Sequence, residues 1–146
     1  MKYKIALIGC GRISFKHIEA FVAMKNETDF IAACDPVLER AEEKKLEYKK
    51  SCSDANVQVF TDYREMLQKC RPDIVTIATE SGKHKDIAVH CLQNGVHVIC
   101  EKPMALSVSD AQEMIHTAKQ NNKKLAVCFQ NRFNAPVVKT REALEK

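Results

Sequence analysis

The sequence near the N-terminus reads Ile5-Ala6-Leu7-Ile8-Gly9-Cys10-Gly11-Arg12-Ile13-Ser14, an apolar run that enters a pair of glycines. Such runs are typical of strands buried on both faces, as in parallel sheets. We predict that Gly9 makes the tight turn after the strand, and that Gly11 leaves room for the backbone to approach a pyrophosphate. The following helix would point its free N–H groups at that pyrophosphate. Ser14 takes the third position of the G-x-G-x-x-G pattern, where a small residue still permits close packing of helix on strand.

The composition predicts one globular domain, because 45% of the 146 residues are hydrophobic and 29% are charged. The net charge of +4 comes from 23 basic and 19 acidic residues, and the lysines are scattered or interleaved with glutamates. A nucleic-acid surface needs basic residues clustered on one face, so we expect no nucleic-acid partner. The apolar runs are too short to span a membrane, and no signal peptide fits before the first strand.

Cysteine and histidine are placed in ways that favour neither disulfides nor a metal site. The seven cysteines have no C-x-x-C spacing, their number is odd, and most lie inside apolar runs. We therefore expect buried free thiols and a reducing, cytoplasmic compartment. Four histidines are predicted to be helix-face or strand-edge residues with no cysteine or carboxylate at metal spacing; these are His17, His90, His97 and His116.

Apolar patterning predicts six strands that alternate with helices. The first helix is expected over residues 12–24, because Phe15, Ile18 and Val22 recur at helical spacing. Parallel strands need crossover helices, so the alternation predicts an α/β fold: a doubly wound parallel sheet in a three-layer αβα arrangement. The strands are expected over residues 5–8, 30–34, 57–60, 73–79, 96–100 and 124–129, and the later helices over 36–50, from about 62, over 83–94, from about 107, and over 135–146.

Asp35 ends the second apolar run. It lies about 20 residues beyond the glycine turn, which is the separation expected for an acidic residue that binds the adenosine ribose. Its carboxylate would accept hydrogen bonds from the ribose hydroxyls and repel a 2′-phosphate. No basic residue directly follows it, which favours NAD over NADP. The alternative is that Asp35 caps the next helix with Pro36 at its first position, and both roles can coexist.

Ligands of doubly wound sheets bind in a crevice at the carboxyl ends of the strands. Every candidate position in this sequence falls at such an end, which is a stronger indication than any single motif. The candidates are Gly9, Gly11, Arg12, Ile13, Asp35, Thr79, Glu80, His84, Glu101, Lys102, Gln130 and Asn131.

At Glu101-Lys102-Pro103 the chain resembles the Gfo/Idh/MocA oxidoreductases, the family of glucose–fructose oxidoreductase and inositol dehydrogenase. The resemblance covers essentially the whole chain and includes the glycine turn, Asp35-Pro36 and the loop from Thr79 to His84. The segment Gln130-Asn131-Arg132-Phe133-Asn134-Ala135-Pro136 is similar to the branch that acts on UDP-N-acetylhexosamines or their uronates, the sugar 3-dehydrogenases.

The resemblance implies that Lys102 sits beside the nicotinamide and the sugar hydroxyl and polarises that hydroxyl during hydride transfer. An ammonium suits this task, because it can bond the hydroxyl oxygen and burial can bring its pKa towards the proton-transfer range. The resemblance also implies that Glu101, Thr79 and Asn131 approach the cofactor. Glu80 departs from the family pattern, which has proline there. His84 matches a family histidine, with a solvent-facing histidine at a helix N-terminus as the alternative.

Family members continue into a second α/β domain that supports oligomers and completes the active site. The resemblance therefore implies that residues 1–130 form the NAD(P)-binding domain and that 131–146 begin the connection to a second domain that this chain lacks. We expect the chain alone to bind NAD and to turn over little, and the full-length enzyme to form homo-oligomers. Two alternatives stay open: a non-catalytic NAD-binding regulatory or scaffolding module, and a class I methyltransferase, which the E-K-P segment disfavours.

Overall fold

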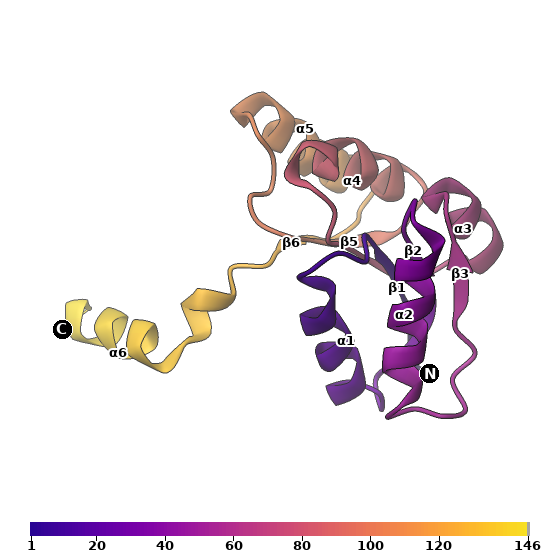
Figure 1. The fold of residues 1–146 in the computed structure, drawn as a ribbon. Coiled ribbons are helices and arrows are strands. Elements are labelled where there is room, and N and C mark those ends of the chain that lie inside the picture. Colours follow the sequence, from indigo (N-terminus) through magenta and orange to yellow (C-terminus); the bar gives the residue numbers. More distant parts are fainter. Residues whose placement is uncertain (146) are drawn as a thin grey trace.

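A six-stranded parallel sheet forms the centre of the molecule, with strand order β3-β2-β1-β4-β5-β6 (Figure 1). The computed structural model describes residues 1–145. The predicted doubly wound sheet is confirmed. The strands are β1 (Tyr3–Ile8), β2 (Thr28–Cys34), β3 (Gln58–Phe60), β4 (Ile74–Ile77), β5 (His97–Cys100) and β6 (Leu125–Val127); the helices are α1 (Ser14–Ala23), α2 (Leu38–Lys49), α3 (Tyr63–Cys70), α4 (His84–Gln93), α5 (Val108–Gln120) and α6 (Ala135–Leu144), with short 3-10 turns η1 (Ser81–Lys83) and η2 (Gln130–Phe133).

The central strand β1 sends alternate side chains into two separate cores. Ile5 and Leu7 pack with buried residues of α1 and α2. Ala6 and Ile8 face the other way, into a core that α3, α4 and α5 complete. Both faces of the sheet are therefore covered, which explains why the strands read as unbroken apolar runs.

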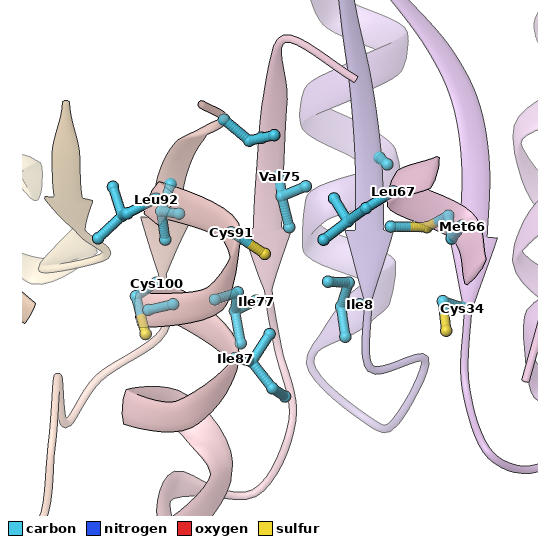
Figure 2. Packing of buried hydrophobic residues seen from close by; sticks show 14 of the residues in the cluster. Ile8, Cys34, Met66, Leu67, Val75, Ile77, Ile87, Cys91, Leu92 and Cys100 are labelled. Atoms are coloured by element: carbon cyan, nitrogen blue, oxygen red, sulfur yellow. The ribbon is translucent and has the colours of Figure 1, made fainter. Parts of the chain in front are cut away.

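The larger core lies between the sheet and helices α3 to α5. Figure 2 shows Ile8 on one strand and Val75 and Ile77 on its neighbour, with Leu92 of α4 to one side and Met66 of α3 to the other. Cysteine thiols fill small gaps in this layer, as predicted for buried free thiols. All seven cysteines are free, and five of them are buried.

Helix α1 lies where it was predicted, and of its three apolar residues Ile18 is buried and Val22 packs against the core. Phe15 is exposed instead. The buried face also includes Ser14, His17 and Phe21, and an apolar pattern does not reveal the two polar residues among them.

The strand order reverses between β1 and β4: β2 and β3 extend the sheet on the side of β1, and β5 and β6 extend it on the side of β4. A crevice forms at the carboxyl ends of these strands, as this topology requires. The C-terminal helix α6 contributes no buried residue and lies apart from the sheet and its covering helices (Figure 1). No helix among residues 1–145 is long and apolar enough to cross a membrane.

Candidate functional site

The two glycines of the turn after β1 meet different surroundings. Gly9 has φ +90°, and a Cβ at this position would lie 2.6 Å from the backbone of Ala78 and Thr79. Only glycine fits there, because β1 and β4 approach each other too closely for a side chain. A Cβ on Gly11 would meet nothing within 4 Å. Gly9 is thus required by the protein itself, and Gly11 borders open space in which a phosphate can approach the backbone.

Ser14, the third position of the glycine pattern, is fully buried at the start of α1. Its hydroxyl donates a hydrogen bond to the carbonyl oxygen of Gly11. The small side chain lets the helix pack closely on β1, as predicted. The neighbouring Arg12 is exposed and Ile13 is half-buried at the N-cap position of α1.

Asp35 lies at the end of β2 and is almost completely buried, with 6% of its surface exposed. One carboxylate oxygen accepts the backbone N–H of Cys10 at 2.8 Å, and the other accepts that of Val37 at 2.9 Å. A carboxylate has about four acceptor positions, so two remain for ribose hydroxyls.

The predicted capping role of Asp35 is wrong. Helix α2 begins at Leu38 with Val37 at its N-cap, so Pro36 is not its first residue and Asp35 lies outside the helix. The bond from Val37 N–H to Asp35 instead forms an Asx turn, in which the side chain accepts from the backbone two residues later. This turn holds the carboxylate beside the glycine turn.

A cavity of about 580 Å³ opens at the switch between β1 and β4. Five predicted cofactor residues line it: Gly9, Gly11, Asp35, Thr79 and Glu80. Its position and lining fit the adenosine and pyrophosphate portion of a dinucleotide.

The cavity also contains basic residues that the sequence analysis missed, Arg40 of α2 and Arg64 of α3. Neither arginine is adjacent to Asp35 in the sequence, so the residues that directly follow this acid do not reveal them. Glu80 pairs with Lys83 at 2.6 Å, and this hydrogen bond holds the pKa of the Glu80 carboxyl below its usual range. The mouth of the cavity therefore carries an ion pair where the family pattern has proline.

His84 is buried, with 1% of its surface exposed, so the solvent-facing alternative is wrong. Its Nδ1 lies 2.8 Å from the carbonyl oxygen of Pro103, and its Nε2 lies 3.0 Å from that of Thr79. The ring joins the loop after β4 to the loop after β5. It holds these loops in place and is not among the residues that line the cavity.

Lys102 is exposed on the loop directly after β5, and the Lys102–Pro103 peptide bond is cis. The adjacent Glu101 is buried and turns towards the protein interior. Its Oε1 lies 3.1 Å from Nε2 of His17, and its Oε2 accepts the backbone N–H of Lys102 at 3.2 Å. The buried Glu101 carboxylate thus fixes the Lys102 backbone through this hydrogen bond.

His17 lies on a face of α1, as predicted, but the expectation that it has no cysteine or carboxylate partner is wrong. It is buried against Glu101, and the thiol of Cys128 lies close to both side chains. Burial lowers the pKa of His17, and the nearby Glu101 opposes that effect. No sequence pattern links the three residues, because they come from α1 and from the ends of β5 and β6.

Gln130 and Asn131 lie in η2, exposed and just before the chain leaves the sheet. They do not line the cavity. The Oδ1 atom of Asn131 accepts a hydrogen bond from the side chain of Asn134 at 3.2 Å.

A parallel sheet in this strand order, with a glycine turn below a helix N-terminus and an acid at the end of β2, is a dinucleotide-binding domain of the Rossmann type. The comparison with known families agrees. The sequence model of the GFO_IDH_MocA family, described as an oxidoreductase family with an NAD-binding Rossmann fold, matches residues 3–129. The chain belongs to this family and is its NAD-binding domain.

Two of the relatives are a D-glucoside dehydrogenase and an inositol dehydrogenase. The chain is 31% identical to D-glucoside 3-dehydrogenase of Escherichia coli over 139 residues, which cover 95% of this chain and 38% of that protein. It is 26% identical to inositol 2-dehydrogenase of Salmonella typhimurium, over 99% of this chain and 42% of that one.

Among solved structures, the WlbA dehydrogenase of Bordetella pertussis in complex with NADH and UDP-GlcNAcA superposes with a TM-score of 0.90 at 30% identity. The match covers 99% of this chain and 42% of that one. The chain thus spans about two fifths of the length of the relatives that it matches.

Proposed function

We propose that the chain is the cofactor-binding part of an enzyme that transfers a hydride between a sugar or nucleotide-sugar hydroxyl and NAD. The observation that carries this proposal is the position of Lys102. Its exposed side chain follows β5 at the carboxyl edge of the sheet, and two buried groups hold its loop. Glu101 accepts the Lys102 backbone N–H, and His84 contacts the carbonyl oxygen of Pro103.

When bound, NAD supplies the hydride acceptor, and the chain's own residues bind and orient the reactants. Gly11 and the N-terminus of α1 would hold the pyrophosphate, and Asp35 the adenosine ribose. The Lys102 ammonium would donate a hydrogen bond to the substrate oxygen and stabilise the negative charge that develops there. Thr79 and Asn131 are proposed to contact the cofactor from the ends of β4 and β6.

Two relatives support the class of substrate. One is named for the oxidation of a D-glucoside at position 3, and the other was crystallised with UDP-GlcNAcA. We propose a pyranoside or a nucleotide-linked aminosugar uronate as the hydride donor.

Residues 1–130 would form the cofactor domain and 131–146 the start of a connection, since the family match ends at residue 129. We further propose that the full-length protein forms homo-oligomers, and the seven free thiols support a reducing, cytoplasmic compartment.

A domain exchange tests the proposal. This chain would replace the matching domain of the E. coli D-glucoside 3-dehydrogenase, and NADH formation would be followed with a D-glucoside and with UDP-GlcNAcA. Enhanced fluorescence of bound NADH would verify that the exchanged domain binds cofactor. We expect turnover with at least one of these substrates.

The variant Lys102→Met should lower kcat by about 100-fold or more while NADH binding changes little. The matched control is Lys119→Met, an exposed lysine on α5, which should keep full activity. If Lys102→Met kept wild-type turnover, Lys102 would not be the group that acts on the substrate oxygen. If the NADH-binding chimera oxidised neither substrate, a non-catalytic NAD-binding module would be the better description.

A further inference from the structure

Three side chains with metal-binding atoms meet just inside the loop that carries Lys102. They are His17 of α1, Glu101 after β5 and Cys128 after β6. Each offers one donor atom, and the three atoms lie within 4.8 Å of one another. These residues lie outside the cavity at the switch point, so the cluster is a separate feature of the molecule.

The cluster is enclosed. His17 and Glu101 are each 8% exposed, and Cys128 is half-buried. Nε2 of His17 lies 3.1 Å from Oε1 of Glu101, and the thiol sulfur of Cys128 lies within 4.8 Å of both atoms. The second carboxylate oxygen accepts the Lys102 backbone N–H at 3.2 Å. This outer hydrogen bond orients the carboxylate, as outer partners commonly orient metal ligands.

We propose that His17, Glu101 and Cys128 form a binding site for Zn²⁺, with the imidazole nitrogen, one carboxylate oxygen and the thiolate as ligands. Nitrogen, oxygen and sulfur are the donors that Zn²⁺ selects, with bonds of about 2.0–2.3 Å. Tetrahedral bonds of that length place donor atoms roughly 3.3–3.7 Å apart, so a small inward movement of the side chains completes the site. The fourth position is left for water or another ligand.

Binding of the metal ion displaces a proton from the site. The Cys128 thiol forms the Zn–S bond and releases its proton to solvent. The neutral His17 ring gives up the hydrogen bond that its Nε2–H donates to Glu101, moves its single proton to Nδ1 by exchange with solvent, and binds the metal through the freed Nε2. No oxidant or reductant takes part. Because Glu101 also contacts the Lys102 backbone, the metal would stabilise the loop that carries Lys102.

Cobalt(II) chloride is the probe, added to the chain after treatment with a chelator. A thiolate ligand produces a near-ultraviolet charge-transfer band, and four-coordinate Co²⁺ gives intense visible bands. We expect both at one equivalent, and we expect one equivalent of zinc chloride to abolish them. Calorimetry in buffers of different ionisation enthalpy should show about one proton released per Zn²⁺.

The variant Cys128→Ser should lose the charge-transfer band, and Zn²⁺ should no longer raise its Tm. The matched control is Cys52→Ser, which removes the other half-buried thiol and should keep both responses. His17→Gln and Glu101→Gln should each weaken Co²⁺ binding by about tenfold or more. Circular dichroism would establish that each variant folds, and Cys128→Ser, the most conservative change, suffices for the test.

The proposal is overturned if the chain gives no charge-transfer band with Co²⁺, or if the band survives in Cys128→Ser. In either case the His17–Glu101 contact is a hydrogen bond that only holds the Lys102 loop. The test does not use turnover, so its outcome is independent of the proposed dehydrogenase activity.

Discussion

The Asp35 carboxylate accepts a 2.8 Å hydrogen bond from the backbone N–H of Cys10, which joins the end of β2 to the glycine turn after β1. The acid and the turn are therefore one unit. Any change at Asp35 affects the position of the turn as well as the proposed contact to ribose. This relationship decides which substitution tests cofactor choice.

Asp35→Asn keeps the size of the side chain and removes its charge. One of the two backbone N–H groups then faces an amide NH₂, at a cost of about 1–3 kcal/mol in the free energy of unfolding. We expect NAD to bind about tenfold more weakly, while the preference for NAD over NADP shrinks by about tenfold or more, because repulsion of the 2′-phosphate is lost. Isothermal titration with both cofactors measures these changes.

The arginines of the cavity supply the control for that experiment. Arg40 and Arg64 line the same cavity as Asp35 and can attract a phosphate, whereas Lys83, which also lines it, pairs with Glu80. Adding Arg40→Ala to Asp35→Asn should remove most of the gain in NADP binding. If NADP binds Asp35→Asn no better relative to NAD, Asp35 does not face the 2′ position of the ribose.

The two glycines of the turn give a matched pair of alanine variants. Gly9→Ala places a methyl group 2.6 Å from the backbone of Ala78 and Thr79, just after β4, at a positive φ, so it should destabilise the fold by about 3 kcal/mol or more. Gly11→Ala meets no protein atom and should leave the free energy of unfolding nearly unchanged. The same Gly11→Ala variant should bind NAD at least about tenfold more weakly.

Urea unfolding and NAD titration of both glycine variants check this pair. A stable Gly9→Ala protein would show that β1 and β4 do not approach as closely as described. Unchanged NAD affinity in Gly11→Ala would mean that the pyrophosphate lies elsewhere.

His84 should stabilise the loop of Lys102 through its two contacts to backbone carbonyl oxygens. Removing the ring in His84→Ala leaves buried polar atoms without partners, which costs about 2 kcal/mol or more. We also expect faster hydrogen exchange of the backbone amides near Lys102, because one side of its loop is released. His90→Ala is the control, since His90 contacts the ring of Tyr63 on α3 and neither loop. Equal exchange in both variants would argue against the role of His84.

The buried thiols should be inert at neutral pH. Burial is the largest influence on the thiols of Cys10, Cys34, Cys91 and Cys100 and raises the pKa of each to about 12. A thiol of that pKa is about 0.01% thiolate at pH 8, and the thiolate is the reactive form. Iodoacetamide should therefore modify these four cysteines only after denaturation, as peptide mass mapping would show. Rapid labelling of any of them in the folded chain would contradict the described core.

The sequence predicted the features that depend on local pattern. The strands followed from unbroken apolar runs, and the glycine turn and Asp35 followed from their spacing along the chain. The start of α2 was misplaced because Pro36 suits a first helical position and nothing local shows that Asp35 bonds Cys10 and Val37 instead.

Contacts between distant residues were beyond sequence reasoning. His17, Glu101 and Cys128 meet only because α1, β5 and β6 converge at one edge of the sheet. The two contacts of His84 depend on how the loops after β4 and β5 pack together. Periodicity and spacing along the chain do not predict such contacts, because they depend on how separate helices, strands and loops pack in the tertiary structure.

The central claim is that this chain binds NAD in the crevice where β1 and β4 diverge. Calorimetric titration of the chain with NAD tests it most directly, with the Gly11→Ala variant as the second sample. The account predicts one NAD per chain, weaker binding of NADP, and loss of most NAD affinity in Gly11→Ala without loss of fold. Absence of NAD binding by the folded chain, or equal affinity in Gly11→Ala, would contradict it.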